Sequence, residues 1–444
     1  MKSLSVGLLG IGTVGGGTYQ VLKRNGDEIA RRAGCDILIK MVADLDTAKA
    51  KSMVGYEVTV VADARAVIAN PDIDVVIELI GGYGIAKTLV MEAIAAGKHV
   101  VTANKALLAV HGAEIFAAAQ ARGVIVAYEA AVAGGIPIIK ALREGLAANR
   151  IQWVAGIING TTNFILSEMR DKGLDFATVL AEAQRLGYAE ADPTFDIEGV
   201  DAAHKISLMS AIAFGTPVQF NKAHIEGISQ LSATDLTYAE QLGYRIKLLG
   251  ITKQVQNDGV SALELRVHPT LIPTKCLIAN VEGAMNAVLV QGDAVGATLY
   301  YGKGAGAEPT ASAVIADLID IARAQECKFE NRVPALGFQP QAMAQTPVLS
   351  INDVVSSYYL RIPVSDKAGV LADIATILAN NTISIDALLQ RESDETHANG
   401  DVIKHIIVLT HNVREGNVRN AIATIEALPT MRGAVTLLRK EELA

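Results

Sequence analysis

Leu4-Ser-Val-Gly-Leu-Leu9 runs directly into Gly10-Ile-Gly-Thr-Val-Gly15 near the start of this 444-residue chain. The apolar run predicts a buried strand, and the second run is a G-x-G-x-x-G motif that opens a helical pattern. Gly10 permits a tight turn, Gly12 lets a pyrophosphate approach the backbone, and Gly15 lets the helix pack closely on the strand. Phosphates would then face the unpaired N–H groups of the helix N-terminus. Alone the motif is weak, because an ordinary glycine turn has the same pattern.

Short apolar runs alternate with helical patterns over the first 135 residues. Helical patterns extend from the glycines to about Ile29 and cover 86–96 and 105–122, and strand-like runs occupy 37–42, 74–80, 99–102 and 124–128. Such alternation indicates βαβ units and a parallel sheet covered on both faces. We therefore predict an α/β fold, with a Rossmann-type doubly wound parallel sheet in a dinucleotide-binding domain over residues 1–135.

The pattern of predicted helices and strands changes after residue 135. Helical patterns at 161–172, 176–186 and 199–214 precede strand-like runs at 244–254, 261–268, 286–291 and 296–301. Helices grouped apart from strands indicate a separate α+β domain, which we place at 136–301 as the catalytic and dimerisation domain. A helix from about Pro309 to Ala324 follows a glycine-rich turn, and segment 302–330 is expected to complete the first domain.

The last quarter of the chain has its own pattern. Residues 331–353 contain three prolines and no clear period, so they predict a linker. Residues 354–444 then read as strands at 359–364, 383–391, 403–410 and 435–439, with helices at 370–380 and 415–427. The order βαββαβ predicts a ferredoxin-like module.

Composition excludes several classes of protein. The formal net charge of -8 argues against nucleic acid as the main partner. No uninterrupted apolar run reaches the ~18 residues that would span a membrane, and the N-terminal strand lacks the features of a signal peptide. Cys35, Cys276 and Cys327 lie far apart without disulfide or metal spacing. We expect a cytoplasmic protein in a reducing compartment.

Asp44, at the end of the second predicted strand, bears on the choice of cofactor. Its carboxylate could accept a hydrogen bond from a ribose 2'-hydroxyl, which favours NAD, whereas Lys49 and Lys51 could pair with the 2'-phosphate of NADP. The interval from Gly15 exceeds the usual ~20 residues, so a solvated turn aspartate is an alternative. The choice between NAD and NADP stays open.

Residues 187–205 contain five carboxylates and a lysine. Asp201 and Lys205 lie four apart where a helix begins, so their side chains share a face. A solvated ion pair would explain that spacing by itself, but the acidic loop leading into the helix favours a binding site. Lys105 follows a parallel strand at the edge where doubly wound sheets bind ligands.

Lysines and acids together suit the reduction of an amino-acid carbonyl compound. A lysine whose pKa is lowered can protonate the alkoxide that forms when hydride reaches a carbonyl carbon. Carboxylates would hold the substrate ammonium, so a zwitterion fits better than a plain hydroxy acid. Two alternatives are a semialdehyde dehydrogenase that forms a thioester, which needs an activated cysteine, and a non-catalytic nucleotide or amino-acid sensor.

Several motifs together resemble the homoserine dehydrogenase family, in that family's order and spacing. They are Gly10–Gly15, Thr102–Lys105, Glu129–Pro137, Asn159–Asn163 and residues 183–205, and the resemblance extends over essentially the whole chain to an ACT-like C-terminal module. It implies the reversible NAD(P)H-dependent reduction of L-aspartate 4-semialdehyde to L-homoserine, on the route to threonine, methionine and isoleucine.

The resemblance also assigns roles to residues. Lys205 matches the family's proton donor and Lys105 its second essential lysine, near the nicotinamide. Substrate contacts are implied at Gly187, Glu190, Asp196 and Asp201. Cofactor contacts are expected at Gly10, Gly12, Thr13, Val14, Gly15, Asp44, Lys105 and Gly306, of which Gly306 belongs to a turn that could equally be a simple helix entry. Members that prefer NADP often have an arginine beside the aspartate, where this chain has Ala43, which permits NAD or dual use.

Two further ligands are implied by the same resemblance. A monovalent cation, usually Na⁺, is expected on the Glu129 side chain and the main-chain oxygens of Val132, Gly134 and Ile136. In the C-terminal module, Asp366-Lys-Ala-Gly369 resembles the ACT loop that receives an amino acid, and L-threonine is the expected feedback inhibitor. A purely structural dimerisation module is the alternative. Family analogy suggests a homodimer through the middle domain or a homotetramer through the ACT modules.

Overall fold

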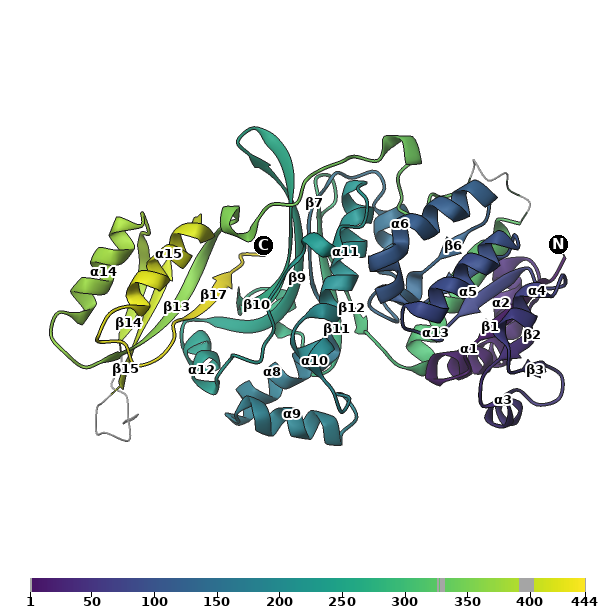
Figure 1. Cartoon of the computed structure of the whole chain (residues 1–444), viewed down its shortest axis with the longest axis horizontal. Coiled ribbons are helices and arrows are strands. Elements are labelled where there is room, and N and C mark those ends of the chain that lie inside the picture. Colours follow the sequence, from purple (N-terminus) through teal and green to yellow (C-terminus); the bar gives the residue numbers. More distant parts are fainter. Residues whose placement is uncertain (1, 326, 328–331, 391–402, 444) are drawn as a thin grey trace.

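The computed structural model describes residues 2–325, 327, 332–390 and 403–443. The predicted strand over 383–391 ends at Arg391, which lies outside the described residues, as do parts of the predicted segments 302–330 and 331–353. The N-terminal domain, the middle domain and the C-terminal module follow one another along the long axis of the molecule (Figure 1).

The N-terminal domain contains a six-stranded parallel sheet in the order β3-β2-β1-β4-β5-β6. Its strands are β1 (Leu4–Leu9), β2 (Ile37–Ala43), β3 (Thr59–Val61), β4 (Val75–Glu78), β5 (His99–Thr102) and β6 (Val126–Ala127). The strand order reverses between β1 and β4, which places a crevice at the carboxyl ends of the strands, where ligands of such sheets bind. The predicted doubly wound sheet is confirmed, although the short, partly exposed β3 was not anticipated.

Helices cover both faces of this sheet. They are α1 (Thr13–Arg24), α2 (Gly26–Ala33), α3 (Thr47–Val54), α4 (Ala64–Ala69), α5 (Gly84–Ala95), α6 (Lys105–Arg122) and α13 (Ala307–Arg323). Apolar side chains of α4, α5 and α6 belong to one core, and those of α1, α2, α3 and α13 to another. The single helical pattern predicted up to Ile29 is in fact two helices, because the chain leaves helical geometry at Asn25. Helix α13 lies tightly on α1, since a Cβ at Gly17 would lie 2.6 Å from the Ala307 carbonyl oxygen.

The middle domain is an antiparallel sheet with helices against it (Figure 1). Its strands are β7 (Ile151–Ile157), β9 (Tyr244–Asn257), β10 (Val260–Pro273), β11 (Met285–Gly292) and β12 (Gly296–Lys303), in the order β12-β11-β7-β9-β10, and the two-residue β8 (His224–Ile225) pairs with β10. Its helices are α7 (Ile138–Lys140), α8 (Gly160–Lys172), α9 (Phe176–Arg185), α10 (Thr194–Ile197), α11 (Val200–Phe214) and α12 (Ala233–Gln241). Strand β7 was not predicted, and α10 is a short helix where the sequence indicated only loop.

The C-terminal module has the predicted βαββαβ order. Its elements are β13 (Val355–Ser365), α14 (Val370–Asn380), β14 (Ile385–Gln390), β15 (Ile403–Thr410), α15 (Glu415–Glu426) and β17 (Thr436–Lys440), with the two-residue β16 (Val413–Arg414) on β13. Strand β17 also pairs in parallel with β10 of the middle domain, with Thr270 opposite Arg439 and Leu271 opposite Lys440. The two sheets therefore form one 11-stranded sheet, which nothing in the sequence indicated.

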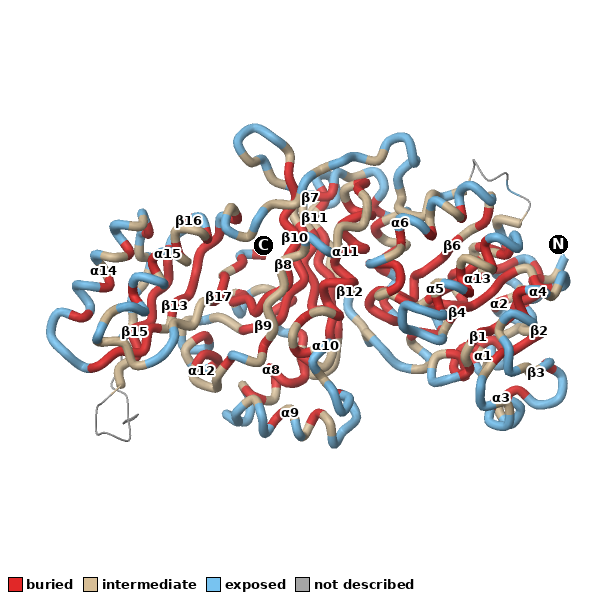
Figure 2. The backbone as a smooth tube through the Cα atoms, in the orientation of Figure 1, coloured by how far each residue is buried: buried red, intermediate tan, exposed pale blue. Residues whose placement is uncertain are grey.

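Residues 332–353, predicted as a linker, lie along the two preceding domains. The Tyr128 hydroxyl donates to the Ala335 carbonyl oxygen (2.6 Å), and the Leu263 N–H donates to the Pro347 carbonyl oxygen (2.8 Å). Buried residues concentrate on the strands and on the helix faces turned toward them (Figure 2). None of the described helices is long and apolar enough to cross a lipid bilayer.

Candidate active site

Lys105 is placed by the turn that follows β5. Asn104 caps helix α6, because its Oδ1 accepts from the Leu107 N–H (3.0 Å), and its Nδ2 donates to the Gly82 carbonyl oxygen (2.7 Å). Thr102 donates to the buried Glu78 carboxylate (2.7 Å), which itself accepts from the N–H groups of the turn after β4. These bonds fix the start of α6 at the carboxyl edge of the sheet, the edge from which Gly10 also leaves β1.

Asp201 joins the two candidate lysines. It lies in the first turn of α11, one turn before Lys205, and its Oδ2 accepts from the Lys205 Nζ (2.7 Å). Its Oδ1 lies 3.1 Å from the Lys105 Nζ. The Lys205 Nζ also donates to the Ile158 carbonyl oxygen (2.7 Å). Asp201 is 4% exposed and Lys205 8%, whereas the Lys105 side chain is 35% exposed, so one lysine is enclosed and the other faces the opening.

Asn159 extends this cluster to Asp196. Its Nδ2 donates to Asp196 Oδ1 (2.7 Å) and to Asp201 Oδ2 (2.8 Å), while its Oδ1 caps helix α8 through the Thr162 N–H (2.9 Å). Thr161 lies 3.3 Å from the other Asp196 oxygen. Asn159 and Thr161 belong to a motif that resembles the family, but neither was predicted as a site residue. The available signal was an asparagine at a helix N-cap within that motif.

The charges of the cluster set its proton affinities. Burial lowers the pKa of Lys205, and the neighbouring Asp201 only partly opposes this. The Asp201 carboxylate raises the pKa of Lys105. Burial alone would raise the pKa of Asp201, but the two lysines hold it well below its usual range. The pKa of Asp196 is raised by burial and by Asp201. Lys205 is therefore the amine that gives up its proton more easily.

The remaining predicted substrate residues lie on the loop between α9 and α10. Gly187 has φ +77° and ends the turn after α9. Glu190 is exposed, and its carboxylate contributes to the raised pKa of Lys105 without a direct hydrogen bond. Glu190 and Lys105 are therefore the more exposed members of the site, and Asp201 and Lys205 are its buried members.

His204 is buried next to Lys205, but it is not a proton carrier. Its ring packs between those of Phe195 and Phe220, with centroid distances of 5.3 and 4.2 Å. Neither ring nitrogen has a hydrogen-bond partner among the described residues, and burial lowers its pKa to about 4. The imidazole is neutral near pH 7 and acts as an apolar packing group.

The glycine motif has the geometry that a dinucleotide needs. Gly10 has φ +89°, and a Cβ at Gly15 would lie 2.2 Å from the Gly10 carbonyl oxygen. A Cβ at Gly12 would meet nothing within 4 Å, so the space in front of the helix N-terminus is open. Asp44 ends β2, and its two carboxylate oxygens accept from the Ile11 N–H (2.8 Å) and the Asp46 N–H (2.9 Å). The residues present fit a dinucleotide, whose pyrophosphate would be held by the backbone N–H groups around Gly12.

The predicted cation loop holds two buried acids. Glu129 is 1% exposed, and its carboxylate accepts from the Ile139 and Lys140 N–H groups (2.9 and 2.8 Å). Its own N–H donates to the buried Asp317 carboxylate of α13 (2.8 Å). Ala133 and Gly134 have φ +55° and +51°, so the loop turns sharply beside the acids. Two buried carboxyl groups beside a sharply turned loop are oxygen ligands of the kind that a hard monovalent cation prefers.

Gly306 precedes helix α13 with φ +127°. The glycine-rich turn before α13 packs against the cation loop, because the Gly135 N–H donates to the Lys303 carbonyl oxygen (3.0 Å) and a Cβ at Gly134 would lie 2.4 Å from the Gly304 carbonyl oxygen. This turn thus connects the cation loop to the helix that covers α1.

Comparisons with known proteins show which family the chain resembles along its whole length. Family models match residues 137–319 (homoserine dehydrogenase), 10–129 (the NAD-binding domain of homoserine dehydrogenase) and 358–430 (the ACT domain). The chain is 58% identical to a homoserine dehydrogenase of Pseudomonas aeruginosa and 57% identical to one of Neisseria gonorrhoeae, covering 100% of each protein in both cases. A crystal structure of a homoserine dehydrogenase from Thiobacillus denitrificans is 60% identical and superposes with a TM-score of 0.94, covering 100% of this chain and 99% of that one.

Proposed function

The chain belongs to the homoserine dehydrogenase family, and we propose that Lys105, Asp201 and Lys205 form the site at which it reduces L-aspartate 4-semialdehyde to L-homoserine. This assignment rests on one observation. Two lysines contact the same buried aspartate, Asp201, at the carboxyl edge of the nucleotide-binding sheet. A bound nicotinamide would supply the hydride.

Each member of the cluster has a task in this proposal. Lys205 donates a proton from Nζ to the alkoxide oxygen, and burial makes that proton easier to release. Lys105 keeps its charge beside Asp201 and stabilises the developing negative charge. Glu190, Asp196 and the backbone at Gly187 hold the polar groups of the substrate.

The first experiment compares Lys205→Ala with the native chain in the oxidation of NADH and NADPH by aspartate semialdehyde. We expect kcat to fall by at least about 10²-fold, the usual contribution of a general acid, while cofactor binding measured by fluorescence titration is retained. Lys172→Ala, on the exposed face of α8, is the control and should keep native turnover. Undiminished turnover in Lys205→Ala would sink the assignment.

For the cofactor, we propose that NADH is used alongside NADPH. Asp44 presents a carboxylate at the end of β2, with Ala43 before it, and a negative charge there disfavours a 2'-phosphate. Gly12, Thr13 and Val14 of the motif would contact the pyrophosphate. Gly306, in the turn before α13, would also contact the cofactor.

For the cation, we propose Na⁺ at Glu129 with the main-chain oxygens of Val132, Gly134 and Ile136. The burial of Glu129 beside Asp317 supports this proposal, because a bound cation would offset the charge of two neighbouring buried carboxylates once they ionise.

For regulation, we propose that L-threonine binds the C-terminal module at the exposed loop Asp366–Gly369, where Gly369 (φ +93°) opens helix α14. Threonine at millimolar concentration should inhibit native enzyme, and Asp366→Ala should raise the inhibitory concentration without changing kcat. A homodimer through the middle domain agrees with the exposed apolar residues Val295 and Tyr301 at its edge strand β12 and Leu277 after β10, and light scattering tests it. The cytoplasmic location stays a prediction.

A further inference from the structure

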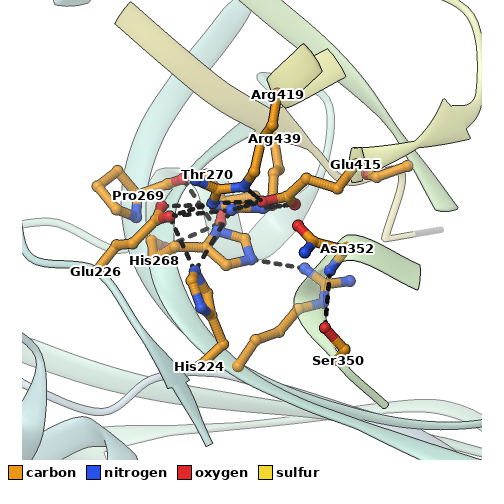
Figure 3. A network of polar contacts seen from close by, with 12 residues as sticks. His224, Glu226, His268, Pro269, Thr270, Ser350, Asn352, Glu415, Arg419 and Arg439 are labelled. Carbon is orange, nitrogen blue, oxygen red and sulfur yellow. Dashed lines mark hydrogen bonds and ion pairs between the residues drawn. The ribbon is translucent and has the colours of Figure 1, made fainter. Parts of the chain in front are cut away.

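A network of charges, buried at Arg439 and Glu415, joins the middle domain to the C-terminal module (Figure 3). Arg439 on β17 is 0% exposed, and its guanidinium lies between Glu226, which follows β8, and Glu415, which begins α15. Its Nη1 lies 2.6 Å from Glu226 Oε2, and its Nε lies 2.6 Å from Glu415 Oε2. Arg419 of α15 also reaches Glu226 (3.0 Å). Glu226 is therefore held by two arginines of the module.

The same place could be mistaken for a metal site. His224, Glu226 and Glu415 are the one group of potential ligands found among the described residues, with ligand atoms within 4.8 Å of one another. Arg439, however, already contacts both carboxylates and supplies the positive charge between them. A charged group can be buried when its partners of opposite charge are this close. The two carboxylates therefore have a cation partner in Arg439 and do not need a metal ion.

The residues next to Glu226 support the substrate-binding segment. The Ile228 N–H donates to the Ile197 carbonyl oxygen (2.8 Å). A Cβ at Gly227 would lie 2.5 Å from that same oxygen, so the two backbones touch. Ile197 directly follows Asp196, whose carboxylate is bonded to Asn159 in the active site.

The start of α11 rests on the same segment. Gly199 has φ +82° and precedes the helix whose second residue is Asp201. A Cβ at Gly199 would lie 3.3 Å from Ile225 Cγ2 and 3.4 Å from the Glu226 carbonyl oxygen. Residues 225–228 therefore contact the chain at both 197 and 199, immediately beside the two site aspartates.

We propose that the C-terminal module braces the substrate-binding segment 196–201 through the Arg439–Glu226 ion pair, which makes Arg439 and Glu226 positioning residues for the active site. The proposal rests on the assigned function of Asp196 and Asp201. When the pair is broken, residues 225–228 lose their anchor on the module, and Ile197 and Gly199 lose their support. The carboxylates that hold the substrate then lose their geometry, while the glycine motif in the other domain is not affected.

The test compares Glu226→Gln with Lys253→Gln in the full-length enzyme. Lys253 of β9 also makes a short ion pair with the module, to Glu441 (2.6 Å), but it does not belong to residues 225–228. Lys253→Gln therefore controls for the loss of an ion pair between middle domain and module. Thermal unfolding of both variants separates a loss of fold from a loss of positioning.

We expect Glu226→Gln to raise the KM for aspartate semialdehyde on the order of fivefold, the size of coupling that such networks carry, with the KM for the nicotinamide cofactor unchanged. Amide exchange over 194–201 should quicken in this variant alone. Glu226→Asp, which keeps the charge, should restore part of the native KM. In a double-mutant cycle with Arg439→Lys the two effects should not add, because the residues are in contact.

An unchanged KM in a folded Glu226→Gln enzyme, or an equal rise in Lys253→Gln, would overturn the proposal. Either result differs from failure of the proposed function, in which the native enzyme would not turn over aspartate semialdehyde or Lys205→Ala would remain active.

Discussion

Asp201 sets the protonation of both lysines, so its replacement should change the pH dependence as well as the rate. Reduction needs a protonated Lys205, and its rate falls as the pH rises through the pKa of that amine. Asp201 keeps this pKa from falling further than burial already takes it. In Asp201→Asn we expect kcat to fall by about 10²-fold or more and the alkaline loss of activity to begin at a lower pH. A pH profile of kcat for the reduction measures the fall in kcat and the shift of the alkaline loss. If the variant lost activity over the same alkaline pH range as the native enzyme, Asp201 would not control the pKa of Lys205.

Asp44 offers a test of cofactor choice, because its charge can be removed while its shape is kept. Its side chain holds the glycine turn through the Ile11 N–H, a bond that an asparagine oxygen can still accept. In Asp44→Asn we expect the ratio of kcat/KM for NADPH over NADH to rise about tenfold, the value of one hydrogen bond to a charged group. Asp46→Asn, on the neighbouring exposed cap of α3, is the control. An unchanged ratio would mean that Asp44 does not contact the ribose.

Single residues could be predicted where a local rule applies. The i,i+4 spacing paired Asp201 with Lys205, and the strand end placed Lys105 near them. Asn159 was missed because its contacts with Asp196 and Asp201 join distant parts of the chain, which no period reveals. The alternative of a thioester-forming enzyme lacks a cysteine in this site, because Cys35 belongs to the nucleotide-domain core and Cys276 packs against a core of the middle domain. Cys327 is exposed beyond the end of α13 and has no contact with the lysine cluster among the interactions of the described residues.

Among the elements, helix α13 and the cation loop share a pair of buried acids whose protonation affects stability. Burial raises the pKa of Glu129 to about 7, and burial together with Glu129 raises the pKa of Asp317 to about 8. Between the ordinary carboxyl pKa values of 4.5 and 3.8 and these raised values, the folded chain holds protons that the unfolded chain has already lost. The resulting stability is fully present below about pH 4 and is lost progressively as the pH rises to about 7 to 8.

A cation at this loop should replace the lost protons. We expect the Tm to fall between pH ~5 and ~8 in choline chloride, and to fall less in sodium chloride of equal ionic strength. In Asp317→Asn the Tm in choline chloride should depend less on pH. Asp320→Asn removes a partner of Lys140 on the outside of the same helix, and it should leave the pH dependence of the Tm unchanged. Identical curves in the two salts would argue against a sodium site.

Elements with a strong period were predicted well, and weak ones were not. Helix α6 has the bounds that the sequence indicated, and β9 and β10 only extend further than expected. Strand β7 was missed because Gln152, Trp153 and Gly156 interrupt its β-branched residues. Strand β8 has only two residues and exists through its pairing with β10.

For the whole molecule, the shared sheet predicts that the middle domain and the C-terminal module unfold together. Trp153, the only tryptophan, lies on β7 in the middle of this sheet and reports on the middle domain. We expect the urea midpoint from Trp153 fluorescence to coincide with that from hydrogen exchange of peptides in 355–390. Exchange of the module at clearly lower urea would show that the two parts unfold separately.

The order and the fold type of the three domains could be predicted from the sequence. The sheet that joins the middle domain to the C-terminal module could not. Local periods identify a βαββαβ module, yet nothing in them indicates that β17 pairs with β10. The buried Arg266 explains the difficulty, because its partners Glu264 and Glu441 come from different domains. A long-range ion pair leaves no local pattern.

The pairing of β10 with β17 also affects the order in which the chain is made. Strand β10 leaves the ribosome well before β17. While the module is translated, the edge of β10 is therefore not yet paired with β17, and Arg266 is not yet paired with Glu441. An uncovered strand edge is a place where nascent chains pair with one another. Arg266 lies on the same strand a few residues before the edge that β17 covers, and its charge keeps this part of β10 hydrated until Glu441 has been translated.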